Sequence, residues 1–221
     1  MMETNPYQDK VILINKPLGW TSFDVVNKLR KILGIKKIGH AGTLDPLATG
    51  LLIVCTGKMT KKIQELTNLD KEYLGNLILG QSTPSHDRET EVTEVRDISG
   101  ITAEHITNAA AHFKGTIEQI PPAHSAVKVK GKRAYKLARK GEMPVLKPRT
   151  VEIHAFDITQ INLPEVHFRV VCSKGTYIRS LVRDLGAKLG TGAYLAELCR
   201  TRIGSFRLDD AKSIESFESL T

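Results

Sequence analysis

A short glycine-rich segment carries the carboxylate that is best placed for chemistry. Residues 39–50 read Gly-His-Ala-Gly-Thr-Leu-Asp-Pro-Leu-Ala-Thr-Gly, and Asp45 is the one acid among them. Pro46 biases Asp45 towards extended or turn backbone, and the glycines allow a ligand to approach the main chain closely. A carboxylate on such a loop can act as a general base or a nucleophile. The residues of this segment alone favour an ordinary Asp-Pro turn.

Several common catalytic motifs are missing from the sequence. Residues 50–58 resemble a phosphate-binding loop, but six residues separate the two glycines and Met59 stands where Ser or Thr is needed. There is no dinucleotide fingerprint, no Gly-x-Ser-x-Gly, and no His-x-Glu with Cys-x-x-Cys. Three cysteines, expected to be reduced thiols, lie far apart at Cys55, Cys172 and Cys199. We therefore expect no metal and no cofactor.

The net charge of +8 is concentrated in one segment. Residues 121–150 contain nine Lys or Arg and one acid, Glu142, whereas the rest of the chain has 23 basic and 23 acidic residues. Such a strip suits a polyanion such as nucleic acid, and a solvated lysine-rich surface is the alternative. Tyr135 and the near absence of acids favour a loop that follows RNA phosphates. The basic residues are Lys128, Lys130, Lys132, Arg133, Lys136, Arg139, Lys140, Lys147 and Arg149.

The hydrophobic pattern indicates the elements that position Asp45. Residues 11–15 are expected to form a strand, and the short apolar run 51–55 is expected to form a buried strand. Ser22 is expected to cap a helix that runs to Leu33 and ends at Gly34. The apolar stripe of this helix is expected at Phe23, Val26, Leu29 and Leu33. Residues 39–50 then form a loop between the helix and the buried strand.

The remaining pattern predicts an α+β fold with a mixed, mostly antiparallel sheet flanked by helices. Further helices are expected over residues 58–66, 102–115, 176–189 and 194–198. Thr102 and Thr176 are the expected N-caps of two of them. Further strands are expected over residues 72–79, 151–158 and 166–172. The order of these elements lacks a regular βαβ rhythm, which favours α+β over α/β.

Residues 39–52 closely resemble the signature of the TruB pseudouridine synthases. The segment is long and chemically unusual, so chance is a poor explanation for the match. Other stretches resemble the same family in the same order, at residues 15–22, 71–73, 79–80, 121–128, 131, 135–141, 173–181 and 198–202. The resemblance extends over about residues 15–206, which is nearly the whole chain. It implies the pseudouridine synthase fold, with residues 121–150 as a basic RNA-gripping insertion.

The resemblance also implies an activity, the isomerisation of uridine 55 to pseudouridine in the T-loop of tRNA. The target base would have to be flipped out of its stack. Asp45 would be the catalytic carboxylate, and Arg179 would pair with it and keep it ionised and oriented. Tyr73 would stack on the target base. Without the resemblance, Arg179 reads as a surface residue of a helix and Tyr73 as a core aromatic of a strand.

Further residues receive roles in substrate binding from the same resemblance. His40 would fill the vacated position in the RNA stack, and Leu198 would line the uracil pocket. Lys16 would support the floor of the site rather than touch RNA, and Tyr177 would stand behind the residues that bind the substrate. The RNA itself would be gripped by Lys128, Lys130, Lys132, Arg133 and Arg139.

Residues 83–87 depart from the Thr-Asp-Thr-x-Asp element of many family members. The chain ends at Thr221, so we expect one catalytic domain over residues 1–221 without the C-terminal RNA-binding (PUA) domain of longer members. The sequence has no export signal and no apolar run that could span a bilayer, which predicts a cytoplasmic protein without a membrane partner. No protein partner is implied, and we expect a monomer.

Two other functions fit parts of this sequence. The basic strip by itself is equally compatible with an RNA chaperone that binds and remodels tRNA without catalysis. The catalytic motifs are also compatible with a subunit of a guide-RNA complex that acts on ribosomal RNA. Asp45 and Arg179 favour an enzyme over the chaperone, and the short C-terminus disfavours the guided subunit.

Overall fold

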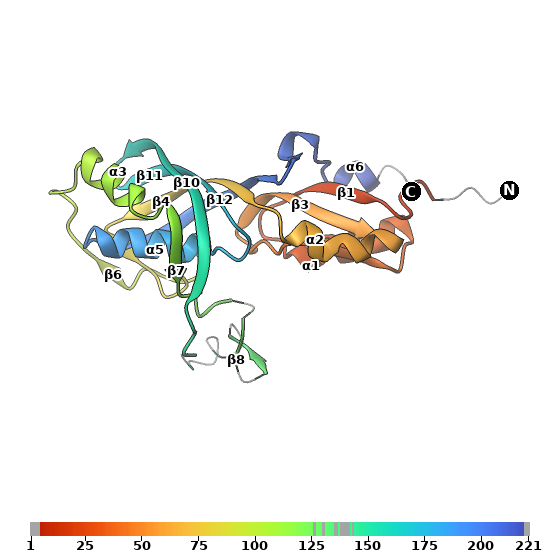
Figure 1. The fold of residues 1–221 in the computed structure, drawn as a ribbon, viewed down its shortest axis with the longest axis horizontal. Helices are drawn as coiled ribbons and strands as arrows, with labels where there is room; N and C mark the ends of the chain where they lie inside the picture. The colour runs from red at the N-terminus through yellow and green to blue at the C-terminus, as the bar shows by residue number, and fades with distance from the viewer. Residues whose placement is uncertain are drawn as a thin grey trace. The chain divides into compact units, whose positions relative to one another are not determined.

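The computed structural model describes residues 5–125, 127–129, 131–134, 137, 142 and 144–218, without the side chains of residues 128, 129, 132 and 133. The chain packs as two compact units (Figure 1). The first unit comprises Met1–Leu74 and Leu198–Thr221, and the second comprises Gly75–Glu197. Strands β4 (Lys71–Leu79) and β12 (Ala193–Ile203) begin in one unit and end in the other. Among the described residues, no helix has the length and apolar character to cross a membrane.

The first unit is built on the strand that follows the Asp45 segment. Strand β3 (Ala48–Thr56) pairs antiparallel with β1 (Val11–Lys16) and β2 (Ile38–Ala41), and parallel with the end of β12. The other elements of this unit are α1 (Ser22–Leu33), η1 (Gly57–Lys62), α2 (Ile63–Thr67), β13 (Phe206–Arg207), η2 (Leu208–Asp210) and α6 (Glu215–Glu218).

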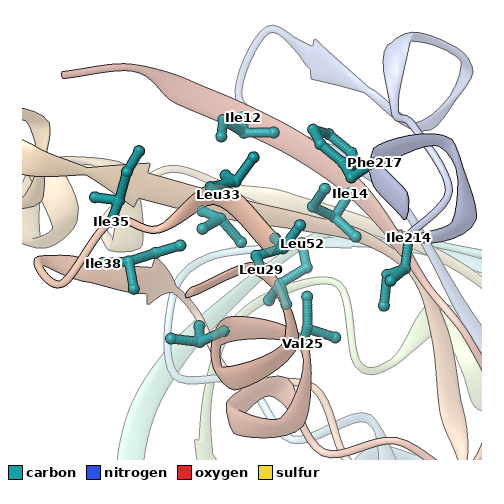
Figure 2. Packing of buried hydrophobic residues seen from close by; sticks show 12 residues of the cluster. Ile12, Ile14, Val25, Leu29, Leu33, Ile35, Ile38, Leu52, Ile214 and Phe217 are labelled. Carbon is teal, nitrogen blue, oxygen red and sulfur yellow. The ribbon is translucent and has the colours of Figure 1, made fainter. Parts of the chain in front are cut away.

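Strand β3 is buried because both of its faces are covered. Leu52 and Val54 pack with residues of β1, α1 and α6, as Figure 2 shows for the cluster around Leu29, Leu52 and Phe217. The alternate residues of β3, among them Leu51 and Ile53, pack with Leu66 of α2 and with Ile203 of β12. Since successive side chains of a strand point to opposite faces, this packing explains why the strand reads as a continuous apolar run. The predicted buried strand over residues 51–55 is confirmed.

The second unit contains the larger part of the antiparallel sheet. Its strand order is β4-β11-β10-β7, with β7 (Gly115–Gln119), β10 (Arg149–Asn162) and β11 (Glu165–Cys172). Alternate residues of β11, including Phe168, are buried, and Phe168 packs edge-to-face on Phe156. The remaining elements are β5 (Gln81–Ser82), β6 (Glu94–Val95), α3 (Ala103–Ala111), β8 (Lys128–Val129), β9 (Lys132–Arg133) and α5 (Ile178–Lys188). The predicted α+β class with a mostly antiparallel sheet is confirmed.

The helix expected over residues 194–198 is wrong, because these residues belong to strand β12. Ala, Glu and Leu in this stretch favour a helix intrinsically, but propensity is weak compared with tertiary pairing. Here Leu198 pairs with Ala48 of β3, and Leu195 donates its amide to the carbonyl of His86 at 3.0 Å. Both bonds join residues far apart in the chain, so no local pattern could reveal them.

Several expected helix boundaries also need correction. Thr21, not Ser22, caps α1 through a capping box with Asp24. Tyr177, not Thr176, is the N-cap of α5, because the Thr176 hydroxyl donates to the carbonyl of Ser173 at 3.0 Å instead. Helix α3 has the expected N-cap, Thr102, but ends at Ala111, before the strand that starts at Gly115.

The apolar stripe of α1 and the glycine-rich loop also differ from expectation. Phe23 is 59% exposed, and Val25 takes its place in the core. The loop is shorter than residues 39–50, because β2 extends to Ala41 and β3 starts at Ala48. The expected helix over residues 58–66 is divided between a 3-10 turn and the short α2.

Gly186 of α5 provides a test of the packing in the second unit. A Cβ atom at this residue would lie 2.3 Å from the amide nitrogen of Ala193 and 2.4 Å from the carbonyl carbon of Gly192. Helix propensity predicts that Gly186→Ala stabilises a helix interior by about 1 kcal/mol. We expect the opposite sign, a loss of roughly 2 kcal/mol in the free energy of unfolding, because two backbones must move apart.

Urea unfolding of the purified variant measures this change. Gly100→Ala is the matched control, since a Cβ atom there meets nothing within 4 Å. If Gly186→Ala is as stable as the wild type, the close approach of α5 to the start of β12 is not a constraint on the fold.

Candidate active site

The loop that carries Asp45 is fastened to the N-terminal motif of the first unit. It consists of residues 42–47, between β2 and β3, and Asp45 is half-buried in it. The hydroxyl of Ser22 accepts a hydrogen bond from the amide of Leu44 at 2.9 Å and donates to its carbonyl at 3.3 Å. The amide of Gly19 donates to the carbonyl of Pro46 at 2.9 Å. The segment 15–22, which ends at the first residue of α1, therefore holds the backbone on both sides of Asp45.

Lys16 lies beneath this loop and is fully buried, with 0% of its surface exposed. Its ammonium donates to the carbonyls of Pro17 at 2.9 Å, Trp20 at 2.6 Å and Pro46 at 3.3 Å. Burial lowers the pKa of Lys16 to about 8, attraction to Asp45 opposes that shift, and repulsion from Arg200 adds to it. Lys16 is thus buried under the loop and bonded to its backbone, and its expected role in support of the floor of the site remains a prediction.

Arg200 is the second buried cation near the loop and was missed as a functional candidate. It is 1% exposed on β12, and its guanidinium donates to the carbonyls of Leu51 at 2.8 Å and Gly42 at 3.0 Å. The sequence contained one signal for it, since Arg200 lies within the family-like stretch 198–202. Its contacts could not be foreseen, because its partners lie about 150 residues earlier in the chain.

His40, Tyr73 and Leu198 lie in strands of the first unit. His40 pairs with Val54, and its Nδ1 atom is buried without a hydrogen-bond partner among the described residues. Burial, with a smaller contribution from Arg200, lowers the pKa of His40, so its imidazole is neutral at pH 7. Tyr73 is buried near the start of β4, and Leu198 pairs with Ala48, the first residue of β3 after the loop. Their proposed contacts with a nucleoside remain predictions.

Arg179 belongs to the second unit and is held by a buried carboxylate there. Its Nη1 atom lies 3.4 Å from Oδ2 of Asp87 and donates to the carbonyl of Ser85 at 3.1 Å. Its Nη2 atom donates to the carbonyl of His124 at 2.9 Å. Asp45 belongs to the first unit, so the pairing of Arg179 with Asp45 remains a prediction.

Asp87 was not predicted as a partner of Arg179. It is the acid of the segment 83–87, where the sequence departs from the family pattern. The hydroxyls of Thr83 and Ser85 donate to its carbonyl at 2.7 and 3.2 Å, and the amide of Glu89 donates to its side chain at 2.9 Å. The changed residues therefore still form a tightly bonded turn around Asp87.

His86 in the same turn has an unusual backbone, with φ +60°. It lines a hollow of about 180 Å³ together with Ser82, Thr83, Arg96 and Arg183, among other residues. Burial, aided by repulsion from Arg183 and Arg179, lowers the pKa of His86 to about 4. The imidazole is therefore neutral at pH 7 in the folded protein.

The remaining candidates lie on α5 and in the basic segment. Tyr177 is half-buried at the start of α5, where its amide donates to the side chain of Gln119 at 2.8 Å and its carbonyl accepts from that side chain at 3.1 Å. Lys130 and Arg139 lie outside the described residues. Lys128 and Arg133 pair across the hairpin of β8 and β9, which also contains Lys132. This backbone pairing brings three basic residues together, although their side chains lie outside the described part of the chain.

Comparisons with known proteins identify the family of the chain. Residues 30–178 match the model of the TruB family pseudouridylate synthase N-terminal domain, and residues 179–221 match the tRNA pseudouridylate synthase B C-terminal domain. The chain is 54% identical to the tRNA pseudouridine synthase B of Phocaeicola vulgatus over 95% of this chain and 92% of that protein. It is 46% identical to that of Opitutus terrae over 100% of this chain and 91% of that protein.

Two solved structures resemble the chain at lower identity. One is a Cbf5-Nop10-Gar1 complex, with a TM-score of 0.74, 34% identity, and coverage of 95% of this chain and 53% of that one. The other is the archaeal box H/ACA sRNP Nop10-Cbf5 complex, with a TM-score of 0.72, 30% identity, and coverage of 96% and 54%. The chain thus spans about half the length of these matched proteins.

The fold and the matched relatives are those of pseudouridine-forming isomerases. The chain belongs to the TruB family of pseudouridylate synthases, since the family model matches well over half of it.

The turn around His86 generates a prediction about pH. The unfolded histidine binds a proton near pH 6.5, whereas the folded one does so only near pH 4. The unfolded state therefore binds more protons between these values, so stability falls as the pH falls through this window. Relative to low pH, where it is lost, the neutral His86 should therefore contribute roughly 2 kcal/mol to the free energy of unfolding at pH 7. We expect His86→Asn to lack this pH dependence, and asparagine tolerates the left-handed backbone at this position.

Urea unfolding of wild type and His86→Asn at pH 7 and pH 4.5 measures the difference. An equal loss of stability in both proteins over this range would show that His86 is not buried in its neutral form.

Proposed function

We propose that the protein isomerises uridine 55 to pseudouridine in the T-loop of tRNA, with Asp45 as the catalytic carboxylate. The proposal rests on the way in which the rest of the first unit holds the loop of residues 42–47. Ser22, Lys16 and Arg200 all bind backbone atoms of this loop or of its flanking strand, so the scaffold fixes the main chain around Asp45. A carboxylate presented in this way is suited to reaction with a nucleoside.

The reaction itself places few demands on the protein beyond such a group. Pseudouridine formation breaks the bond between uracil N1 and the ribose, turns the base and joins the ribose to C5. All atoms are kept, so the chemistry requires neither a redox cofactor nor a nucleotide. It requires a carboxylate at the nucleoside, a pocket from which water is excluded, and a group that removes the C5 proton.

We assign the other candidate residues roles around the proposed catalytic Asp45. Arg179 orients Asp45, Tyr73 stacks on the everted base, and Leu198 lines the uracil pocket. His40 is neutral and planar, which suits a residue that replaces the base in the RNA stack. The basic segment 121–150 grips the RNA phosphates, with Lys128, Lys130, Lys132, Arg133 and Arg139 as its contacts.

The relatives favour tRNA over a guided substrate. Proteins named tRNA pseudouridine synthase B match at about half identity, and the chain covers about nine tenths of their length. The Cbf5 complexes match at 30–34% identity, and the chain spans about half of the matched proteins. We therefore propose an enzyme that selects its substrate without a guide RNA and acts as a monomer in the cytoplasm. Both units would form one catalytic domain.

Asp45→Asn tests the catalytic role of Asp45. The amide has nearly the shape of the carboxylate but cannot act as a base or a nucleophile in its place. We expect pseudouridine formation on unmodified tRNA to fall by at least about 10⁴-fold, while the dissociation constant for tRNA changes by less than about threefold. Single-turnover assays with mapping of pseudouridine at nucleotide resolution, together with filter binding, provide both numbers.

Turnover by Asp45→Asn at the wild-type rate would remove Asp45 from the mechanism. Equal turnover by wild type and variant at a very low level, with strong tRNA binding by both, would instead favour the RNA chaperone.

A T-arm stem-loop tests the choice of substrate. We expect the purified protein to modify an isolated T-arm stem-loop at its T-loop uridine without any added RNA or protein. The matched control is the same stem-loop with that uridine replaced by cytidine, on which no pseudouridine should form. Activity that depends on a second RNA would instead support a guided enzyme.

A further inference from the structure

Arg200 connects the two backbone segments on either side of the Asp45 loop. Its Nη2 atom donates to the carbonyl of Gly42, the first residue of the loop, at 3.0 Å. Its Nε atom binds the carbonyl of Leu51 on β3, which follows the loop, at 2.8 Å. A guanidinium presents its donors in a rigid planar fork, so two carbonyls bound by one group are fixed relative to each other. Arg200 therefore sets the distance between the two ends of the loop.

Two glycines give Arg200 the room for these contacts. Gly50 has φ +99°, and a Cβ atom there would lie 2.4 Å from the carbonyl oxygen of Arg200 and 2.7 Å from its amide nitrogen. Gly42 has φ +85°, and a Cβ atom there would lie 3.6 Å from the Nη1 atom of Arg200. Any other residue at position 50 would push β12 away from β3. The missing side chain of Gly50 thus leaves room for the backbone of Arg200, and that of Gly42 leaves room for its guanidinium.

The charge of Arg200 adds a second constraint. Lys16 and Arg200 are both fully buried and close enough for the positive charge of Arg200 to lower the pKa of Lys16. Two buried cations destabilise a fold unless negative groups and hydrogen bonds offset their desolvation. The groups of opposite charge that act on Lys16 are Asp45 and, more weakly, the exposed Asp24. Asp45 therefore offsets part of the buried positive charge of Lys16.

From these contacts we propose that Arg200 is a positioning residue for pseudouridine formation, which acts through the loop that carries Asp45 and does not touch the RNA. The proposal rests on the proposed catalytic role of Asp45. A reacting group must be held within a fraction of an ångström, and a displacement of about 1 Å can cost about 100-fold in rate. Arg200 thus contributes to catalysis by fixing the main chain rather than by contacting the substrate.

Arg200→Lys is the test of this proposal. A lysine keeps the charge, but its three donors share one nitrogen, so it cannot occupy the two separate positions from which Nε and Nη2 of Arg200 donate. We expect kcat to fall by about 100-fold, with KM and the dissociation constant for the T-arm stem-loop within about twofold of wild type. The matched control is Arg207→Lys on β13, an exposed arginine of the same unit, for which we expect wild-type kinetics.

A second variant separates positioning from a loss of folding. Gly42→Ala strains the carbonyl that Arg200 binds while the arginine itself remains, and we expect the same fall in kcat with unchanged RNA affinity. Circular dichroism and thermal melting of both variants report whether the fold is retained. If Arg200→Lys does not fold, Gly42→Ala decides the question.

Two results would overturn the proposal. In one, the folded variant keeps kcat within about threefold of wild type. In the other, RNA affinity falls in proportion to kcat, which would make Arg200 part of the RNA-binding surface. Neither result bears on Asp45 itself, whose role fails only if Asp45→Asn remains active. The two hypotheses are therefore separable in one set of assays.

Discussion

The binding of backbone carbonyls by buried cations is the interaction on which the site depends. Lys16 and Arg200 together engage the carbonyls of Gly42, Pro46 and Leu51, in addition to those of their own neighbourhood. Carbonyl groups in a short loop have no strand or helix partner, and leaving them buried without one is costly. Charged donors satisfy them strongly and at fixed distances. The loop is consequently ordered in large part by the buried cations of the scaffold around it.

The second unit also contains a buried cation, and there a carboxylate holds it in place. Arg179 is only 3% exposed, and its guanidinium lies beside Asp87 within a turn that is itself closed by Thr83 and Ser85. The turn thereby fixes an arginine that the proposed mechanism needs in one orientation. Each unit thus holds one short segment through buried charged groups, and such contacts are weak evidence for added stability.

Much of the fold could be predicted from local pattern, and the failures that bear on the site depend on contacts between residues remote in the sequence. The strand at residues 51–55, the helix that ends at Gly34 and the cap at Thr102 follow from periodicity and capping chemistry. Residues 194–198 were expected to be helical because their pairing partners are distant in sequence. Asp45 was visible through its loop and the family-like segment around it. Arg200 and Asp87 were not, since their roles depend on contacts between remote parts of the chain.

The parallel pairing of β12 with β3 has a consequence for the timing of assembly. The side chain that joins the ends of the loop lies about 150 residues after it, so a nascent chain lacks this contact until Arg200 has been made and β12 has paired with β3. Long-range contacts of this kind also close slowly, because a large loop entropy must be overcome first. A chain that stops before Arg200 therefore lacks the contact that joins the two ends of the Asp45 loop.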